Sequence, residues 1–514
     1  MTKRPELLKK MIFAGAFLAL LGLLSFLCLY RLDVLPLQNW DEARHGVSAY
    51  EMIMTGDPVV TTYGYEPDYW NLKPPLSEYC IALFYRLFGF SIPSLRLYAA
   101  LSTILCALAC SIYALRHSGR AAGLFTLLSF SAVPTYLFTH GARSGDADAL
   151  YVLLYTMAVL CLSMDTGSAV YPALAGLFGG LAFLTKSWHA GIIVLIILLT
   201  YFIRGRRENN SGNSGNSAGS RSAAAHLLIS AVSCAVPVLF WAALRIMRDG
   251  FSFIGAMIGK DVVSRSVHGA EDHAEDVLYY AGKLLADKGI IACLILIVVL
   301  LAAGGAGSRD SEKVRRPEEK VFRASGDRVP VILGALLPVV LFSIPATKLS
   351  WYVYCAYPCI FLLASQGLQL LWERLKGRQS AVRTAAAILI VFLISALSAR
   401  NNVRDLREFK KNTLAADVAL FTLIDRTSDY AGSDIYIDIV LDTEESWEQR
   451  DFLAAELSGD LHPREGEAAG WLSDPEALLL VNRYTIEALD ERAEYHVVAA
   501  SPDELYYILA HGKD

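Results

Sequence analysis

The sequence contains few charged residues for its length, and its positive and negative charges nearly cancel. Of 514 residues, only 19% are Asp, Glu, Lys or Arg, 54% are hydrophobic, and the formal net charge is -5. Soluble chains of this size are richer in charge. The absence of a basic excess also argues against nucleic acid as a partner. The composition therefore predicts a membrane protein, with the lipid bilayer as its surroundings.

Cysteine is scarce and follows no metal-ligand spacing. The nine cysteines lie almost entirely inside apolar runs, as Cys106 and Cys110 do, so we expect them to act as small packing residues. The sequence also lacks a Gly-rich phosphate-binding loop, so nothing in it indicates a nucleotide site. Neither feature points to a soluble metalloenzyme or to a nucleotide-dependent enzyme.

Long hydrophobic runs are abundant, and each is about the length that spans a bilayer. They lie near residues 11–30, 94–115, 121–139, 148–164, 170–185, 188–203, 225–247, 289–305, 329–345, 350–372 and 384–399. No small-residue cleavage site follows the first run, so we interpret it as a span and not as a signal peptide. The sequence therefore predicts a mainly α-helical, polytopic domain over residues 1–399 with about eleven helices.

Basic clusters orient these helices. Four basic residues between positions 3 and 10 place the N-terminus in the cytoplasm by the positive-inside rule. With alternating crossings, the later basic clusters also fall inside, near 116–120, 204–221, 309–328 and 374–383. Two long loops, 31–93 and 248–288, then fall outside. The expected location is a multi-pass protein of the cell membrane.

Residues 400–514 form a polar tail, which an odd number of crossings places outside the membrane. Within the tail, β-rich runs at 435–441, 477–481 and 495–500 alternate with helical patterns. Such alternation is typical of a small α/β module. We therefore expect an extracytoplasmic α/β domain over residues 400–514, and find no catalytic constellation in it.

The first outer loop carries two groups that could do chemistry. Asp41 and Glu42 follow the first span directly, and a carboxylate held there could deprotonate an acceptor or bind a metal. The alternative is an ordinary helix N-terminus, where acidic residues favour the dipole. Lys73 precedes two prolines and could bind a phosphate, although a single lysine at this depth more often snorkels toward lipid headgroups.

Further cations lie at the expected outer ends of helices. Arg143 stands one turn from Asp146, and Lys186 and Lys348 follow apolar runs. Each alone is explained by snorkelling. Together with Lys73, they would suit a lipid-linked phosphate or pyrophosphate, whose charge needs several cations.

The second outer loop is rich in polar residues. Arg265 could complete a phosphate clamp, and His268 and His273 are candidate ligands for a divalent metal ion. Their spacing matches no established ligand pattern, and a solvated polar loop is the alternative. A divalent metal is thus a candidate cofactor, and no other cofactor is indicated.

Five motifs carry a family resemblance over roughly residues 10 to 370. They are WDEARHG at 40–46, NLKPPLSEY at 71–79, GARSGDADALY at 141–151, GGLAFLTKS at 179–187 and ATKLSWYVYCAYP at 346–358. In this order they resemble the family 39 glycosyltransferases of GT-C architecture. The chain looks closest to the bacterial branch with the lipid A aminoarabinose transferase, and more distantly resembles the protein O-mannosyltransferases.

The resemblance implies an inverting glycosyltransferase. Its donor would be a polyprenyl-phosphate-linked sugar, and its acceptor a glycolipid, a cell-envelope polymer or a protein at the outer face of the membrane. By motif position, Asp41 would activate the acceptor with Glu42 in support, and Lys73 and Arg44 would lie near the donor phosphate. The other residues implied at the phosphate are Arg143, Arg265, Lys348 and Tyr352, supported by Asp146 and Lys186.

The chain departs from the aminoarabinose branch at two places. Leu72 stands where that branch has a glutamate, and Asp261-Val262 replaces a glutamate-histidine pair. These departures weaken the inference of a metal site like that of the aminoarabinose branch. The second departure also weakens the inference that lipid A is the acceptor. A transporter or flippase for a lipid-linked sugar is the alternative function, although such proteins carry midplane ionisable groups and repeats that we do not find here.

Overall fold

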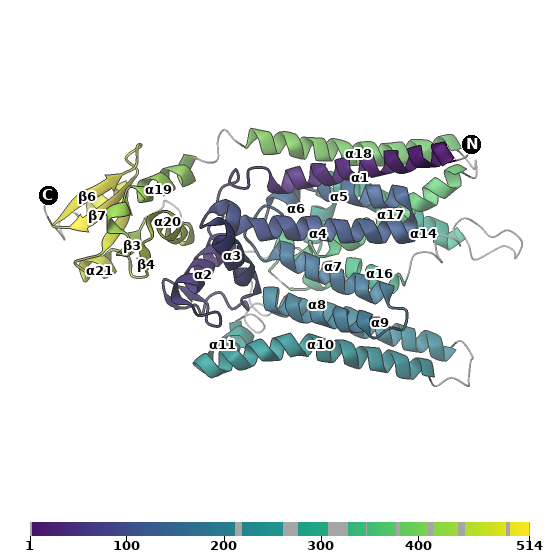
Figure 1. Ribbon diagram of the computed structural model, residues 1–514, viewed down its shortest axis with the longest axis horizontal. Helices are drawn as coiled ribbons and strands as arrows, with labels where there is room; N and C mark the ends of the chain where they lie inside the picture. The colour runs from purple at the N-terminus through teal and green to yellow at the C-terminus, as the bar shows by residue number, and fades with distance from the viewer. Residues whose placement is uncertain are drawn as a thin grey trace, which may run out of the picture.

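A computed structural model describes residues 3–210, 218–260, 276–306, 327–345, 347–376, 381–409, 415–439, 448–489 and 494–512. Long helices run side by side in a bundle, and a small domain with a β-sheet lies at one end of it (Figure 1). The N-terminus lies at the opposite end. The predicted fold class, mainly α with a small C-terminal α/β domain, is confirmed.

The bundle contains all eleven predicted apolar runs. Its helices are α1 (Lys3–Leu29), α4 (Ile92–Ser118), α5 (Arg120–Ser131), α6 (Pro134–Phe138), α7 (Asp148–Met164), α8 (Val170–Lys186), α9 (Gly191–Asn210), α10 (Ala218–Asp249), α14 (Lys288–Ala306), α16 (Val329–Phe342), α17 (Ala356–Lys376) and α18 (Ala381–Glu408). The runs near 121–139 and 350–372 each include a break: α6 follows α5 after Ala132 and Val133, and the 3₁₀ helix η3 (Ser350–Val353) precedes α17.

Several helices are long and apolar enough to cross a bilayer. In the described part of the chain, five segments meet this test, and the pair α13 (Tyr279–Ala286) and α14, bent by 101°, makes a sixth if it is one span. The shorter helices α7 and α16 are also apolar. On α10, Leu239 and Phe240 are 65% and 67% exposed, which suits a lipid-facing surface. The protein is therefore a multi-pass membrane protein.

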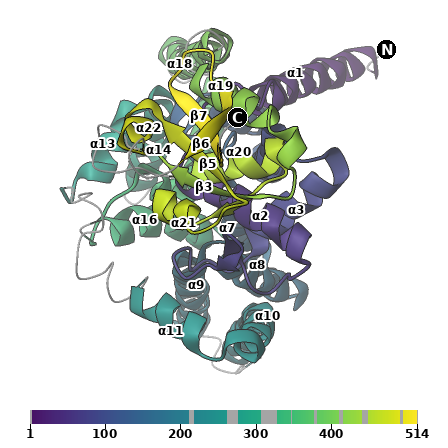
Figure 2. The ribbon, with the colours of Figure 1, turned by 90° about the vertical axis from the view of Figure 1, so that its left-hand side faces the viewer.

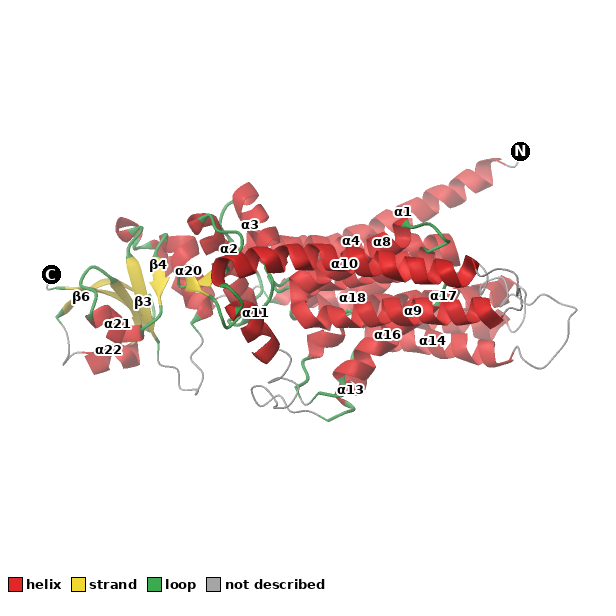
Figure 3. Ribbon diagram, turned by 90° about the horizontal axis from the view of Figure 1, so that it is seen from below, coloured by secondary structure: helices red, strands yellow, loops and turns green. Residues whose placement is uncertain are grey.

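The segment between α1 and α4 folds at the end of the bundle that carries the C-terminal domain. It contains α2 (Asp41–Thr55), the short strands β1 (Thr62–Tyr63) and β2 (Glu66–Pro67), and α3 (Leu76–Phe88). Figures 1 and 3 show α2 and α3 between the bundle and the sheet of the C-terminal domain. The short helix α11 (Ser252–Met257) packs beside the end of α10.

Helix α18 continues to Glu408, past the predicted boundary at residue 400, and from α19 onward the chain contains a five-stranded mixed sheet in the order β4-β3-β5-β7-β6. The elements of the C-terminal domain are α19 (Ala415–Asp425), η4 (Ser428–Tyr430), β3 (Asp434–Asp438), α20 (Gln449–Gly459), β4 (His462–Arg464), α21 (Glu467–Leu472), β5 (Leu478–Asn482), α22 (Arg483–Leu489), β6 (Tyr495–Ala500) and β7 (Tyr506–His511). Strands β4, β3 and β5 are parallel, while β7 is antiparallel to β5 and β6. Figure 2 shows this sheet in front of the bundle.

Helices α8 and α10 approach closely at small residues, as membrane helices commonly do. A Cβ atom added at Gly176 would lie 2.1 Å from the backbone oxygen of Ser230 on α10, whereas one at Gly191 would have nothing within 4 Å. Because backbone cannot yield easily, we expect Gly176→Ala to destabilise the protein by about 1–3 kcal/mol. Thermal unfolding in detergent should show a lower midpoint for Gly176→Ala than for Gly191→Ala. Equal midpoints would contradict this packing.

Candidate active site

Asp41 and Lys73 form an ion pair at the end of the bundle nearest the C-terminal domain. Asp41 is the first residue of α2, and its Oδ1 lies 2.8 Å from Nζ of Lys73. Pro74 and Pro75 follow the lysine and restrict its backbone before α3 begins. The side chains of Asp41 and Lys73 are 25% and 18% exposed, so neither is fully buried.

The electrostatic surroundings keep Asp41 ionised. Burial raises the pKa of its carboxyl, but the positive charges of Lys73, His45 and His140 lower it more, so the pKa lies well below its usual range. The N-terminus of α2 also favours a negative charge here. Asp41 is therefore a carboxylate at neutral pH, and it is a weak base for as long as Lys73 stays beside it.

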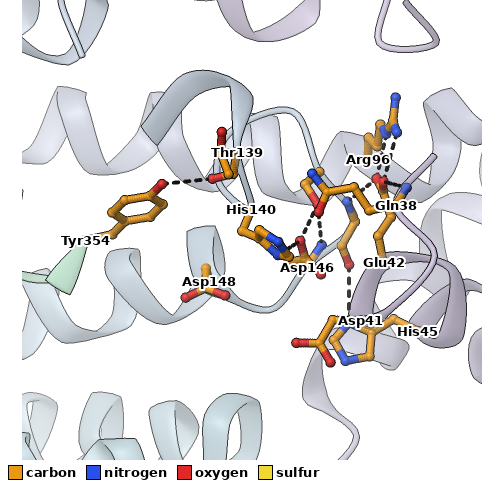
Figure 4. A network of polar contacts seen from close by, with 12 residues as sticks. Gln38, Asp41, Glu42, His45, Arg96, Thr139, His140, Asp146, Asp148 and Tyr354 are labelled. Atoms are coloured by element: carbon orange, nitrogen blue, oxygen red, sulfur yellow. Dashed lines mark hydrogen bonds and ion pairs between the residues drawn. The ribbon is translucent and has the colours of Figure 1, made fainter. Parts of the chain in front are cut away.

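Glu42 is the next residue, and it is fully buried. Arg96 of α4 donates to both of its oxygens, from Nε at 2.6 Å and from Nη2 at 2.8 Å. The backbone N–H groups of Gln38 and Gly145 also donate to the Glu42 carboxylate, at 3.0 and 2.6 Å. Arg96 also donates to the carbonyl oxygens of Leu32, Leu35 and Pro36. Glu42 thus fixes the start of α2 to α4 and to the turn before α7 (Figure 4).

That turn holds a histidine–aspartate pair close to Asp41. Nδ1 of His140 lies 2.7 Å from Oδ2 of Asp146, which also accepts from the hydroxyl of Ser144 at 2.5 Å. The His140 ring stacks on Trp351 with centroids 3.7 Å apart. Burial lowers the pKa of His140, but Asp146 raises it more, and the histidine in turn outweighs burial and lowers the pKa of Asp146. His140 also faces Asp41 and is one of the groups that lower the pKa of that carboxyl.

A second ion pair joins α8 to α7. Nζ of Lys186 donates to Oδ1 of Asp148 and lies 5.4 Å from the centre of the Tyr352 ring. Lys348, which is 4% exposed, donates to the carbonyl of Pro345 at 2.8 Å. Figure 4 shows Asp148 beside His140 and Asp146, on the same side as Asp41. Lys186 is therefore linked through Asp148 to His140, which also faces Asp41.

Two arginines predicted at a phosphate have structural partners. Arg44 makes a bidentate ion pair with Asp68, at 2.8 and 2.9 Å, and lies over the rings of Tyr63 and Trp70. Arg143 is 1% exposed and donates to carbonyl oxygens that end α1, those of Leu27, Tyr30 and Arg31. In this conformation the two guanidinium groups stabilise the loop and the end of α1.

The candidate metal ligands His268 and His273 lie, with Arg265, in residues 261–275, outside the described residues. Among the residues that the structure does describe, no group of three or more His, Cys, Asp or Glu side chains could hold a metal ion. The metal prediction therefore stays a prediction.

Three residues of this region were not singled out from the sequence: Arg96, His140 and Asp148. Arg96 had a signal, because a lone arginine inside an apolar run needs a polar partner. His140 directly precedes one of the recognised motifs and Asp148 stands within it, but neither had a signal of its own: the sequence does not show that His140 pairs with Asp146, and the partner of Asp148, Lys186, comes from another helix.

The chain is similar in sequence to a known family and to a known transferase. Residues 72–241 match the family described as dolichyl-phosphate-mannose-protein mannosyltransferase. An undecaprenyl phosphate-alpha-4-amino-4-deoxy-L-arabinose arabinosyl transferase of Aeromonas salmonicida is 26% identical over 71% of this chain and 62% of its own length, so less than two thirds of that protein is matched.

Two solved structures share the fold. ArnT from Cupriavidus metallidurans, bound to undecaprenyl phosphate, has a TM-score of 0.69 at 18% identity, covering 98% of this chain and 99% of its own. The oligosaccharyltransferase AglB from Archaeoglobus fulgidus, in complex with an inhibitory peptide and a dolichol-phosphate, has a TM-score of 0.53 at 11% identity, covering 97% of this chain and 74% of its own. The similarity to ArnT extends over the bundle and the C-terminal domain.

Proposed function

We propose that this membrane protein, a GT-C glycosyltransferase related to the aminoarabinose and O-mannosyl transferases, moves a sugar from a polyprenyl-phosphate donor to an acceptor. The reaction takes place at the end of the bundle that carries α2 and the C-terminal domain. This end faces away from the cytoplasm, because basic clusters flank the spans on the opposite side. The acceptor is a glycolipid, a cell-envelope polymer or a protein.

The single observation that carries the proposal is the pairing of Asp41 with Lys73 at a partly exposed position. The reaction needs a base for the acceptor and a cation for the leaving group, and the pair supplies both. The acceptor oxygen or nitrogen attacks the anomeric carbon as the bond from that carbon to the phosphate oxygen breaks. Asp41 takes the acceptor proton, and polyprenyl phosphate leaves with the bonding electrons. Direct displacement inverts the anomeric carbon.

Lys73 links donor binding to activation of the base. When the donor phosphate draws the lysine away from Asp41, the main influence that lowers the pKa of the carboxyl is weakened. Asp41 then becomes a stronger base at the moment the donor is in place. Lys186 could bind the phosphate only by exchanging its partner Asp148, as Lys73 exchanges Asp41, while Arg44 keeps its place in the loop through Asp68.

Glu42 has a positioning role in this proposal. Both of its oxygens accept hydrogen bonds from Arg96 and from backbone groups, so the carboxylate is committed to holding α2 in place. The transporter or flippase alternative has no observation in its favour, since the named relatives are transferases.

Replacement of Lys73 tests the proposal. In vesicles supplied with extracted polyprenyl-phosphate-linked sugars, we expect Lys73→Met to lower transfer of labelled sugar by about 10²–10³-fold, because a charge contact to the leaving group is lost. Since the lysine no longer lowers the pKa of Asp41, the acid side of the residual pH–rate profile should move to higher pH.

The control for this experiment is Lys283→Met, an exposed lysine of α13, which should leave transfer within about twofold of native. Native-like transfer by Lys73→Met would contradict the assigned role. Absence of transfer by the native chain from every polyprenyl donor would contradict the proposed function itself.

A further inference from the structure

The C-terminal domain packs directly on α2 through α20. The aromatic rings of Tyr63 and Phe452 stack with centroids 4.6 Å apart, and Asn39 accepts from the backbone N–H of Arg450 at 3.0 Å. A Cβ added at Gly46 of α2 would lie 2.9 Å from the Leu453 side chain, so the two helices are in close contact. Figure 1 shows α20 next to α2. The helix that begins with Asp41 is therefore one wall of this interface.

Two glutamates from opposite sides of the interface meet in its interior. Glu51 of α2 is fully buried, and Glu456 of α20 is 2% exposed. One oxygen of Glu51 accepts from the backbone N–H of Tyr65 at 2.9 Å. Among the described groups, the other oxygen of Glu51 and both oxygens of Glu456 have no donor. The two carboxyl groups are within hydrogen-bonding reach of each other, but they can bond only if one carries a proton.

The groups around the pair do not neutralise it. In the described part of the chain, no salt bridge involves Glu51 or Glu456. The surrounding titratable groups are Tyr50 of α2, Tyr63 and Tyr65 of the first outer loop, Tyr85 of α3, and Asp460 and Arg464 of the C-terminal domain. Arg464 is the cation among these six, and its Nε is paired with Asp434 at 3.0 Å. Asp460 accepts from the hydroxyl of Tyr50 at 2.7 Å.

We propose that a proton shared between Glu51 and Glu456 holds the C-terminal domain on α2, so that docking of the domain weakens as the pH rises. With one proton present, one carboxyl donates to the other. Without it, two negative charges face each other in a buried interface where no described salt bridge neutralises either of them, and undocking lets water reach both. The proposal concerns docking alone and does not depend on the reaction proposed above.

The direction of the pH effect follows from proton binding. Burial raises the pKa of Glu51 from its ordinary value of 4.5 to about 7, and burial together with the facing charge of Glu51 raises that of Glu456. The docked state therefore binds more protons than the undocked state. Docking is strongest below pH 4.5 and weakens as the pH rises toward 7, by up to about tenfold per pH unit for one proton.

Hydrogen–deuterium exchange on the full chain in nanodiscs tests this directly. After correction for intrinsic exchange, we expect protection of the amides around Glu51 and Glu456 to fall severalfold between pH 5 and pH 7, while α8 stays unchanged as an internal reference. Glu456→Gln keeps the shape and offers an N–H donor to Glu51 but removes one of the two acids, so the fall in protection with rising pH should be clearly smaller than in the native chain. Glu487→Gln, on an exposed residue of the same domain, should behave as native.

Two results would overturn the proposal. Protection that does not change with pH in the native chain would exclude a shared proton, and so would an unaltered pH dependence in Glu456→Gln. If that variant fails to fold, as loss of protection in α8 would show, Glu51→Gln gives the same comparison from the other side. Opening of the interface by a chelator at constant pH would show that a metal ion, and not a proton, joins the two carboxyl groups.

Discussion

Replacement of Asp41 by asparagine should nearly abolish sugar transfer. The amide keeps the size of the side chain and a carbonyl oxygen for Lys73, but it cannot take the acceptor proton. Loss of a positioned base costs about 10²–10⁴-fold in rate. We expect kcat to fall in this range while the thermal midpoint stays near the native value, because the position is partly exposed.

Glu66→Gln is the matched control for this result, since Glu66 is an exposed acid of the same loop and lies in β2. It should transfer sugar at the native rate. If Asp41→Asn retained transfer within a few fold of native, the carboxylate would not be the base, and Asp41 would be only the acidic first turn of a helix.

Replacement of Arg96 by methionine should have the largest effect on stability. It leaves the buried Glu42 carboxylate without its cation, and breaking a buried ion pair in this way costs about 3–5 kcal/mol. The same change also removes the hydrogen bonds that Arg96 donates to three carbonyl oxygens in the segment before α2. We expect a strongly lowered unfolding midpoint and loss of transfer, since the start of α2 carries Asp41.

A double variant separates the charge from the shape of the side chain. Adding Glu42→Gln to Arg96→Met removes the unpaired buried charge, so part of the lost stability should return. A native-like midpoint for the single Arg96→Met variant would contradict the ion pair as the support of this site. So would a double variant that is less stable by the full sum of the two single effects.

The helices could be predicted because hydrophobic runs of spanning length leave the backbone no alternative in lipid. Every predicted run coincides with a helix, and three strands of the C-terminal sheet were also predicted from their β-rich composition. The strands β4 and β7 were missed: β4 has only three residues, and both strands pair with strands that were predicted, β3 and β5. The resemblance to the GT-C glycosyltransferases, drawn from five motifs, agrees with the family match over residues 72–241 and with the Aeromonas relative, and the chain shares the fold of ArnT.

The partners of charged side chains could not be predicted in the same way. Arg44 was expected near a phosphate from its motif position, and the sequence does not show that Asp68 pairs with it. The same holds for Arg143, whose carbonyl partners belong to the end of α1. Hydrophobic residues recur at a regular spacing that reveals a helix or a strand, but a single charged residue has no such pattern. Its hydrogen-bond partner is set by the distant segment that folds beside it.

The measurement that tests the central claim most directly is the product balance of the purified native chain. The chain would be reconstituted in nanodiscs with one polyprenyl-phosphate-linked sugar and an acceptor extract, and both products would be quantified by mass spectrometry. We expect polyprenyl phosphate and glycosylated acceptor to form in equal amounts, with the anomeric configuration inverted. Donor that stays intact, or that releases free sugar without a glycosylated acceptor, would contradict the assignment of this protein as a polyprenyl-phosphate-dependent glycosyltransferase.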